Sequence, residues 1–442
     1  MSQPDAPAPD SPQHTAPRGA LPRSVAAAKN LQPRLAALGG ALALGLAAIV
    51  FARAGEAAQA LFTRLVTAQP LAPLVLTPAL FVAVTWLTRT RCAAARGSGI
   101  PQVMAAAEAP AHPAMVPLLS LRTALAKFGG TLAMLLSGAS VGREGPTVQI
   151  SAAIMVAVHR WLRVPVGSGV IIAGGAAGVA AAFNTPLAGV AFAIEELAAA
   201  FEQRLALLVM LAVMTAGLVS LGLSGDYVYF GAMSQRVPIV PALVAALGTG
   251  VAGGLAGGLF ARILSTFGTI GHGWIGRLRA RPVALAAGLG LLVAVIGIAT
   301  HGLTWGTGYG TTRSLLSGGE ASLWFGPAKF VAALATALSG APGGIFAPSL
   351  SVGAGLGQLA GTLFPPGYSG AVAMLGMIAY FAGVTRAPLT AVIIVMEMTA
   401  DRGMILPLFA AALVADYVSA QICPEKLYHA LSHPFRATPA AH

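Results

Sequence analysis

Two adjacent charges, Arg143 and Glu144, interrupt the apolar stretch "LLSGASVGREGPTVQISAAIMVAV" at Leu135–Val158. A second acidic pair, Glu195–Glu196, ends another apolar segment. A charge at the centre of a bilayer costs about 2.5–3.5 kcal/mol on insertion scales. If these segments lie in a membrane, the charges indicate a function that requires them there.

Three Gly-Pro turns each open an apolar, helix-compatible segment: "GSGIP" at Gly97–Pro101, "GREGP" at Gly142–Pro146 and "GGIFAP" at Gly343–Pro348. Glycine lets a ligand approach the backbone, and proline is compatible with the first helical turn. Each turn would present unpaired N–H groups and the positive end of a helix dipole. One such turn is an ordinary helix start, but three together predict an anion site without a buried cation. An ion that must also leave its site needs such moderate binding.

The elements that position these turns are predicted to be membrane helices. The chain is 56% hydrophobic and 9% charged, with a mean hydropathy of +0.78. Soluble proteins carry about 25% charged residues. Many apolar runs are shorter than the roughly 20 residues that span a bilayer, or contain Gly and Pro. The sequence therefore predicts an all-α polytopic membrane protein with tilted and broken helices.

The first 33 residues are rich in Pro, Ala and Ser, which predicts a disordered tail. Basic residues precede the first apolar run at Arg18, Arg23, Lys29 and Arg34. By the positive-inside rule they place the N-terminus in the cytoplasm. Most of the net charge of +12 is then explained by basic residues that set the orientation in the membrane, so we expect no nucleic-acid partner.

The chain contains an internal repeat. Residues 126–146, "AKFGGTLAMLLSGASVGREGP", match 328–348, "AKFVAALATALSGAPGGIFAP", at 11 of 21 positions and an offset of 202. The same offset aligns "NTPLAGVAFAIEE" with "RAPLTAVIIVMEM". Two homologous halves are predicted, at about 34–223 and 238–420. Transporters built from such repeats bind substrate at the repeat interface, on broken helices.

Residues that match between the two halves indicate structural roles, whereas residues present in one half indicate specific functions. Glu195 matches Glu397, and Lys127 matches Lys329, which favours a role in the shared fold, such as a helix-end bond. Lys127 could also add positive potential for anions, and Arg143 could attract anions or hold its loop; the sequence leaves both open.

By contrast, Glu144 matches Phe346 and Glu196 matches Met398. Each of these two carboxylates is present in one half only. We expect a specific task at such unmatched positions.

The three turns, in this order, resemble the signature motifs of the CLC chloride channel and transporter family. "AAAFNTPLAGVAFAIEEL" at Ala180–Leu197 and "KLYHAL" at Lys426–Leu431 are also similar to that family. The resemblance extends over about residues 34–433. It implies a fold of two inverted-topology repeats with tilted and broken helices, and a homodimer in which each subunit has its own ion pathway.

The resemblance also implies a chloride site. The ion would be held by the hydroxyls of Ser98 and Tyr428 and by the backbone N–H groups of Ile345 and Phe346. All four are neutral donors, as the three turns alone predicted. Serine at position 98 resembles members that prefer chloride.

Glu144 corresponds to the gating glutamate of the family, which competes with the anion when ionised and moves aside when protonated. Glu196 corresponds to the internal proton-transfer glutamate of the exchanger branch. The resemblance thus implies exchange of chloride for protons, without metal or organic cofactor. Two alternatives remain open: a role for Glu196 as the cap of a helix end, and a passive voltage- or pH-gated chloride channel on the same fold.

Other classes of function are disfavoured. "GASVG" at Gly138–Gly142 fits a hydrolase pattern around Ser140, but histidines lie mostly in loops or at segment ends, so we expect no enzyme. No phosphate-binding loop is present. We expect a short helix at about 424–433 and a tail at 434–442. The expected location is the inner (plasma) membrane, with both termini cytoplasmic, as in prokaryotic antiporters of the family.

Overall fold

The computed structural model describes residues 23–197, 203–225, 228–231, 235, 237–269, 272–401 and 403–436. Within these ranges the regular structure is helical, apart from one isolated β-bridge between Gly142 and Gly344. The predicted all-α architecture is confirmed.

The helical elements of the first half end before residue 225. They are α1 (Arg23–Ala68), α2 (Pro73–Arg91), η1 (Ala93–Ala95), α3 (Ile100–Glu108), η2 (Pro113–Leu119), α4 (Leu121–Leu136), α5 (Glu144–Trp161), α6 (Ser168–Phe183), α7 (Pro186–Phe192), the π-helical turn η3 (Ala193–Leu197) and α8 (Gln203–Ser224).

The elements of the second half repeat much of this order. They are α9 (Ile239–Thr269), α10 (Gly273–Ala280), α11 (Pro282–Ala299), α12 (Tyr309–Leu316), α13 (Phe325–Leu338), α14 (Phe346–Gly361), η4 (Pro366–Tyr368), α15 (Ser369–Thr385), α16 (Pro388–Thr399) and α17 (Ile405–Ile422). The chain then returns toward the first half through α18 (Leu427–Ser432) and η5 (His433–Phe435), and α18 packs against α3 and α9.

Two predicted boundaries differ from the structure. Helix α1 begins at Arg23 and contains Pro33, so residues 23–33 are helical, although they were expected in the disordered tail. The segment "SVAAAKN" is rich in alanine, the best helix former. The prediction gave more weight to the prolines of the tail than to these alanines. At the other end, η5 extends the ordered chain past the predicted boundary at 434. The rest of the two predicted tails, residues 1–22 and 437–442, lies outside the described residues.

Among the described residues, seven helices are long and apolar enough to cross a membrane: α1 from Gln32, α2, α8, α9, α11, α15 with its preceding turn, and α17. Large apolar side chains on several of them are exposed, as expected for surfaces that face lipid tails. Helices α6 and α15 are instead buried almost all round, and both are apolar on every face. The chain is thus a multi-pass membrane protein with a helical centre shielded from lipid.

Glycine allows the central helices of the second half to pack closely. Gly253 and Gly257 of α9 lie against the backbone of α15, and Gly353 and Gly357 of α14 lie against its other side. A methyl group at Gly253 or Gly257 would come within 2.6 Å of α15 backbone atoms. Small residues at such crossings are typical of membrane helix pairs. In lipid the hydrophobic effect does not drive helices together, so close van der Waals packing contributes more to their association.

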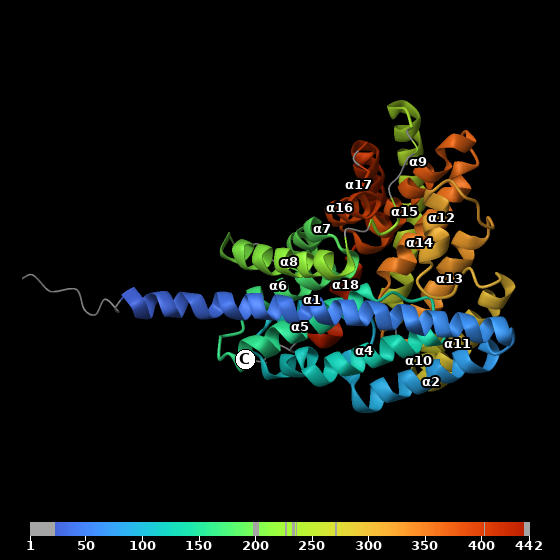
Figure 1. The fold of residues 1–442 in the computed structure, drawn as a ribbon. Helices are drawn as coiled ribbons and strands as arrows, with labels where there is room; N and C mark the ends of the chain where they lie inside the picture. Colours follow the sequence, from blue (N-terminus) through green and yellow to red (C-terminus); the bar gives the residue numbers. More distant parts are fainter. Residues whose placement is uncertain are drawn as a thin grey trace, which may run out of the picture.

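The two halves are related by the predicted inverted symmetry. Helices α5, α6 and α7 correspond to α14, α15 and α16, and both α6 and α15 end at a left-handed residue, Asn184 and Arg386. In Figure 1, α4–α6 of the first half and α12–α15 of the second form separate groups that meet near the middle. At this junction Gly142 and Gly344, equivalent residues, pair antiparallel. A contact between a residue and its own counterpart is what a two-fold axis produces.

Candidate functional site

Two helix N-termini from opposite halves meet at the symmetry axis. The N–H of Gly142 donates to the carbonyl of Gly344 at 2.7 Å, and the N–H of Gly344 donates back at 2.8 Å. Helix α5 begins two residues after Gly142 and α14 two residues after Gly344. The unpaired N–H groups and positive dipole ends of both helices therefore converge.

The third predicted turn joins them. The N–H of Gly97 donates to the carbonyl of Gly340, and the N–H of Gly343 donates to the carbonyl of Gly97, both at 3.1 Å. Gly99 has φ +108°, which favours glycine, and its Cα faces the carbonyl of Gly145 in α5. The three Gly-Pro turns, far apart in sequence, thus form one site.

Four neutral donors are placed at this site. The hydroxyl of Tyr428 lies beside that of Ser98, and neither hydroxyl makes a hydrogen bond of ordinary geometry to a described residue. The N–H groups of Ile345 and Phe346, at the start of α14, donate to no carbonyl among the described residues. Buried polar groups normally have partners, so these orphan donors indicate a ligand. The predicted residues Ser98, Tyr428, Ile345 and Phe346 are brought together.

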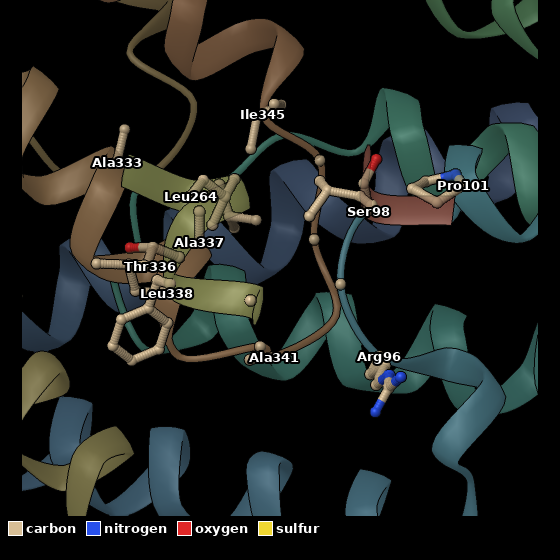
Figure 2. Close-up of a pocket in the computed structure, with 18 of the residues that line it drawn as sticks. Arg96, Ser98, Pro101, Leu264, Ala333, Thr336, Ala337, Leu338, Ala341 and Ile345 are labelled. Atoms are coloured by element: carbon tan, nitrogen blue, oxygen red, sulfur yellow. The ribbon is translucent and has the colours of Figure 1, made fainter. Parts of the chain in front are cut away.

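A cavity of about 280 Å³ leads to this site. Figure 2 shows Ser98 and Ile345 on one wall, with Thr336 and Ala337 of α13 opposite and Arg96 further along the Ser98 segment. Arg89 and Arg279 also line it. Positive charge in a partly enclosed space raises the local concentration of anions.

Glu144 is the first residue of α5, but its carboxylate lies beside the N-terminus of α14. Its side chain is completely buried, and Oε2 lies over the Cα of Gly142, beside Ala347 and Pro348 in the first turn of α14. Neither carboxylate oxygen makes a hydrogen bond of ordinary geometry to a described residue. The carboxylate thus occupies the kind of position in which a helix N-terminus binds an anion.

Arg143 holds its loop against helix α1. Its Nη1 donates to the carbonyl of Ala52 at 2.8 Å and to Oε1 of Glu56 at 2.9 Å, both in α1. The alternative that the sequence left open for Arg143, holding its loop, is therefore the arrangement observed.

Glu196 lies in the π-helical turn η3 that follows α7. π-helical turns are frequent at functional sites. The Glu196 side chain is 1% exposed, and its Oε1 lies 3.4 Å from Nζ of Lys426, the residue before α18. Its Oε2 has no hydrogen-bond partner among the described residues.

The neighbouring Glu195 has a different environment, which confirms its predicted structural role. Glu195 accepts from the N–H groups of Leu389 and Thr390 at the start of α16, at 3.1 and 2.6 Å. Its counterpart Glu397 accepts from Leu187 and Ala188 at the start of α7, at 3.2 and 2.8 Å. Each half thus caps a helix of the other. Glu196 takes no part in this capping, so the alternative that it is a helix cap is not the arrangement observed.

The two buried lysines also match across the repeat. Nζ of Lys127 donates to the carbonyls of Gly97 at 2.8 Å and Arg96 at 3.3 Å. Nζ of Lys329 donates to the carbonyls of Gly306 at 2.7 Å and Thr304 at 2.9 Å. Both lysines therefore fix a loop, as the shared position predicted.

Three residues near the site were not predicted: Glu56, Arg386 and Lys426. Arg386 binds Asp416 at 3.2 Å and the carbonyls of Cys423 and Pro424, and so fixes the segment that leads to Tyr428. A signal existed for Lys426, which belongs to the "KLYHAL" motif. For Glu56 and Arg386 the pairing depends on tertiary contacts that sequence spacing does not reveal.

The fold and this site define a class: membrane transport proteins in which inverted repeats place broken-helix termini around an ion site. More particularly, the chain belongs to the family described as "Voltage gated chloride channel", whose model matches residues 79–420. The predicted family membership is confirmed.

Several relatives are similar over most of their length. The chain is 34% identical to the H(+)/Cl(−) exchange transporter ClcA of Yersinia pestis, over 76% of this chain and 72% of the relative. It is 32% identical to ClcA of Vibrio vulnificus, over 82% and 79%.

Solved structures share the fold. A slow cyanobacterial Cl−/H+ antiporter superposes with a TM-score of 0.77 at 26% identity, covering 91% of this chain and 97% of that one. A CLC-type fluoride/proton antiporter gives a TM-score of 0.75 at 24% identity, covering 92% and 98%.

Proposed function

We propose that the protein exchanges chloride for protons across the inner (plasma) membrane of a bacterium. The observation that carries this proposal is the position of two buried carboxylates, those of Glu144 and Glu196. Both are buried: Glu144 lies beside the first turn of α14, and Glu196 lies beside Lys426, two residues before Tyr428. An anion site flanked by two groups that can carry protons is suited to coupled exchange. The relatives described as exchange transporters support the same activity.

Chloride would be held by Ser98, Tyr428, Ile345 and Phe346. Four neutral donors bind an anion without the strong attraction of a full cation, which permits release. The arginines of the cavity wall would supply chloride from the cytoplasmic side, in agreement with the positive-inside rule. In this orientation both termini are cytoplasmic.

Glu144 would act as gate and outer proton carrier. Its carboxylate lies at the start of α14, so it would hold the place of an anion when ionised and leave it when protonated. Glu196 would exchange protons with the cytoplasm by a path that diverges from that of chloride. Water would bridge the two carboxylates.

We further propose that the protein is a homodimer in the bilayer. Helices α8 and α17 present large exposed apolar side chains, among them Leu218 and Tyr417, that a second subunit could cover. Chemical cross-linking in membranes at low expression would give a dimer band; a monomer throughout would contradict this part of the proposal.

The test is chloride efflux from proteoliposomes into low chloride, with external pH recorded and voltage clamped by an ionophore. Chloride leaving with protons moving inward, against their own gradient, is the expected result. Chloride flux without proton movement would establish the alternative, a passive channel. Repeating the assay with fluoride distinguishes the anion, because one structural neighbour is described as a fluoride/proton antiporter.

Two substitutions and a neighbouring control assign the roles. Glu196→Gln should remove proton movement and retain chloride flux. Glu144→Gln should remove proton movement and the dependence of chloride flux on pH. Glu195→Gln changes the adjacent carboxylate, which binds helix α16, and should keep the coupling. Coupling that survives Glu196→Gln would exclude Glu196 from the proton path.

A further inference from the structure

Among the described residues, one ammonium group accompanies the buried Glu196. Nζ of Lys426 lies 3.4 Å from Oε1 of Glu196, the one salt-bridge contact of this carboxylate within 4 Å among those residues. The guanidinium of Arg386, another cation in this region, is engaged by Asp416 and by two backbone carbonyls. Lys426 is therefore the cation placed to balance an ionised Glu196.

Lys426 also spans two environments. Its side chain is 32% exposed, whereas that of Glu196 is 1% exposed, so Lys426 reaches from solvent to a carboxylate that solvent hardly reaches. It immediately precedes α18, two residues before Tyr428. Its Nζ also donates to the carbonyl of Glu195 at 3.4 Å, which ties the start of α18 to η3.

A proton-transfer step makes a counter-charge necessary. When Glu196 releases its proton to a cytoplasmic water, a carboxylate remains and the water becomes hydronium. An ionised carboxylate in a buried position is costly unless it is paired or hydrogen-bonded. Glu195 receives two backbone N–H groups, but Oε2 of Glu196 has no hydrogen-bond partner among the described residues. The ammonium of Lys426 is the group that compensates.

We propose that Lys426 is a positioning residue for the proton half of the exchange, where it holds Glu196 in place and balances its charge after each proton release. The inference rests on the proposed exchange of chloride for protons. It separates Lys426 from the chloride path, because neither Lys426 nor Glu196 is among the proposed chloride donors.

The experiment compares Lys426→Gln with Lys426→Arg in proteoliposomes. Lys426→Gln can still donate to the Glu195 carbonyl but has no charge. We expect its proton flux to fall about tenfold relative to chloride flux, since hydrogen bonds to charged groups contribute at least that factor. Lys426→Arg keeps the charge and should restore the coupling ratio, read from the reversal potential. Arg277→Gln, an exposed cation on α10, is the control for loss of positive charge and should leave the ratio unchanged.

The outcomes separate the inference from the proposed function. If wild-type protein moves chloride without protons, the proposed function is wrong. If the wild type is coupled and Lys426→Gln is equally coupled, only the inference about Lys426 is wrong. If Lys426→Gln does not fold, Lys426→Arg decides, because loss of coupling in a folded protein that retains the charge would overturn the inference.

Discussion

The two repeats share a backbone and differ at the positions where chemistry is expected. At the start of α5 stands the carboxylate of Glu144; at the equivalent position of α14 stands the ring of Phe346. That ring lies 4.9 Å from the ring of Phe381 and 6.0 Å from that of Tyr428, in a packed aromatic group. One helix start therefore carries a group that can take a proton, and the other packs beside the anion donors.

Positions that carry the same residue in both halves make equivalent contacts. Glu195 and Glu397 exchange caps, and Lys127 and Lys329 fix equivalent loops. The comparison teaches that the frame is present twice, whereas each of the two proposed proton-carrying carboxylates, Glu144 and Glu196, is present in one half only. Three predictions test how far this division extends.

The largest difference is expected between Gly142→Ala and Gly344→Ala. A Cβ at position 142 would lie 2.3 Å from Oε2 of Glu144, the movable end of a side chain. A Cβ at position 344 would lie 2.9 Å from the backbone nitrogen of Gly145, which cannot move alone. Gly142→Ala should displace Glu144 and weaken the pH dependence of chloride flux. Gly344→Ala should lower the flux itself by about tenfold, as overpacking of 1–3 kcal/mol would.

Flux against external pH in proteoliposomes distinguishes these two effects. Gly129→Ala is the control, because that helical glycine has open space around its Cα. Identical pH profiles for Gly142→Ala and Gly344→Ala would contradict the prediction that the two glycines of the bridge have different roles.

A smaller difference between the two halves, with an equal loss of stability, is expected for Lys127→Met and Lys329→Met. Each removes the donor of two buried carbonyl bonds. The free energy of unfolding should fall by about 2–4 kcal/mol in each variant, measured by denaturation in detergent. Chloride flux should fall further in Lys127→Met, because Gly97 adjoins Ser98. A large stability loss in one variant and none in the other would break the symmetry argument.

The smallest effect is expected for Glu195→Ala and Glu397→Ala. Each removes the cap of a helix start in the opposite half. Loss of a cap costs about 0.5–2 kcal/mol, and the two variants should lose similar amounts in the same unfolding assay. The ratio of protons to chloride should stay that of the wild type; a changed ratio in either would show that these carboxylates also serve transport.

Much of the helical scaffold could be predicted from the sequence, because the two repeats can be aligned with each other. The offset of 202 indicated that Glu195 was structural and left two roles open for Lys127; the contacts show Glu195 capping a helix and Lys127 holding a loop. Apolar composition predicted the membrane helices, whereas the start of α1 was missed because the proline-rich tail outweighed the helix-forming "SVAAAKN" that follows.

The parts that could not be predicted depend on contacts between distant segments. Neither periodicity nor spacing pairs Arg143 with Glu56, or Glu196 with Lys426. The bridge between Gly142 and Gly344 was equally hidden, although the repeat alignment already placed the two glycines at equivalent positions.

The crossed caps have a consequence for biosynthesis. When the first half leaves the ribosome, the N–H groups at the start of α7 await Glu397, which is made about 200 residues later. Domains usually fold as units in order of synthesis, but here neither half can complete its hydrogen bonding alone. A chain truncated after α8 would therefore lack the two hydrogen bonds that hold the start of α7. We expect the start of α7 to become fixed after the second half has been made.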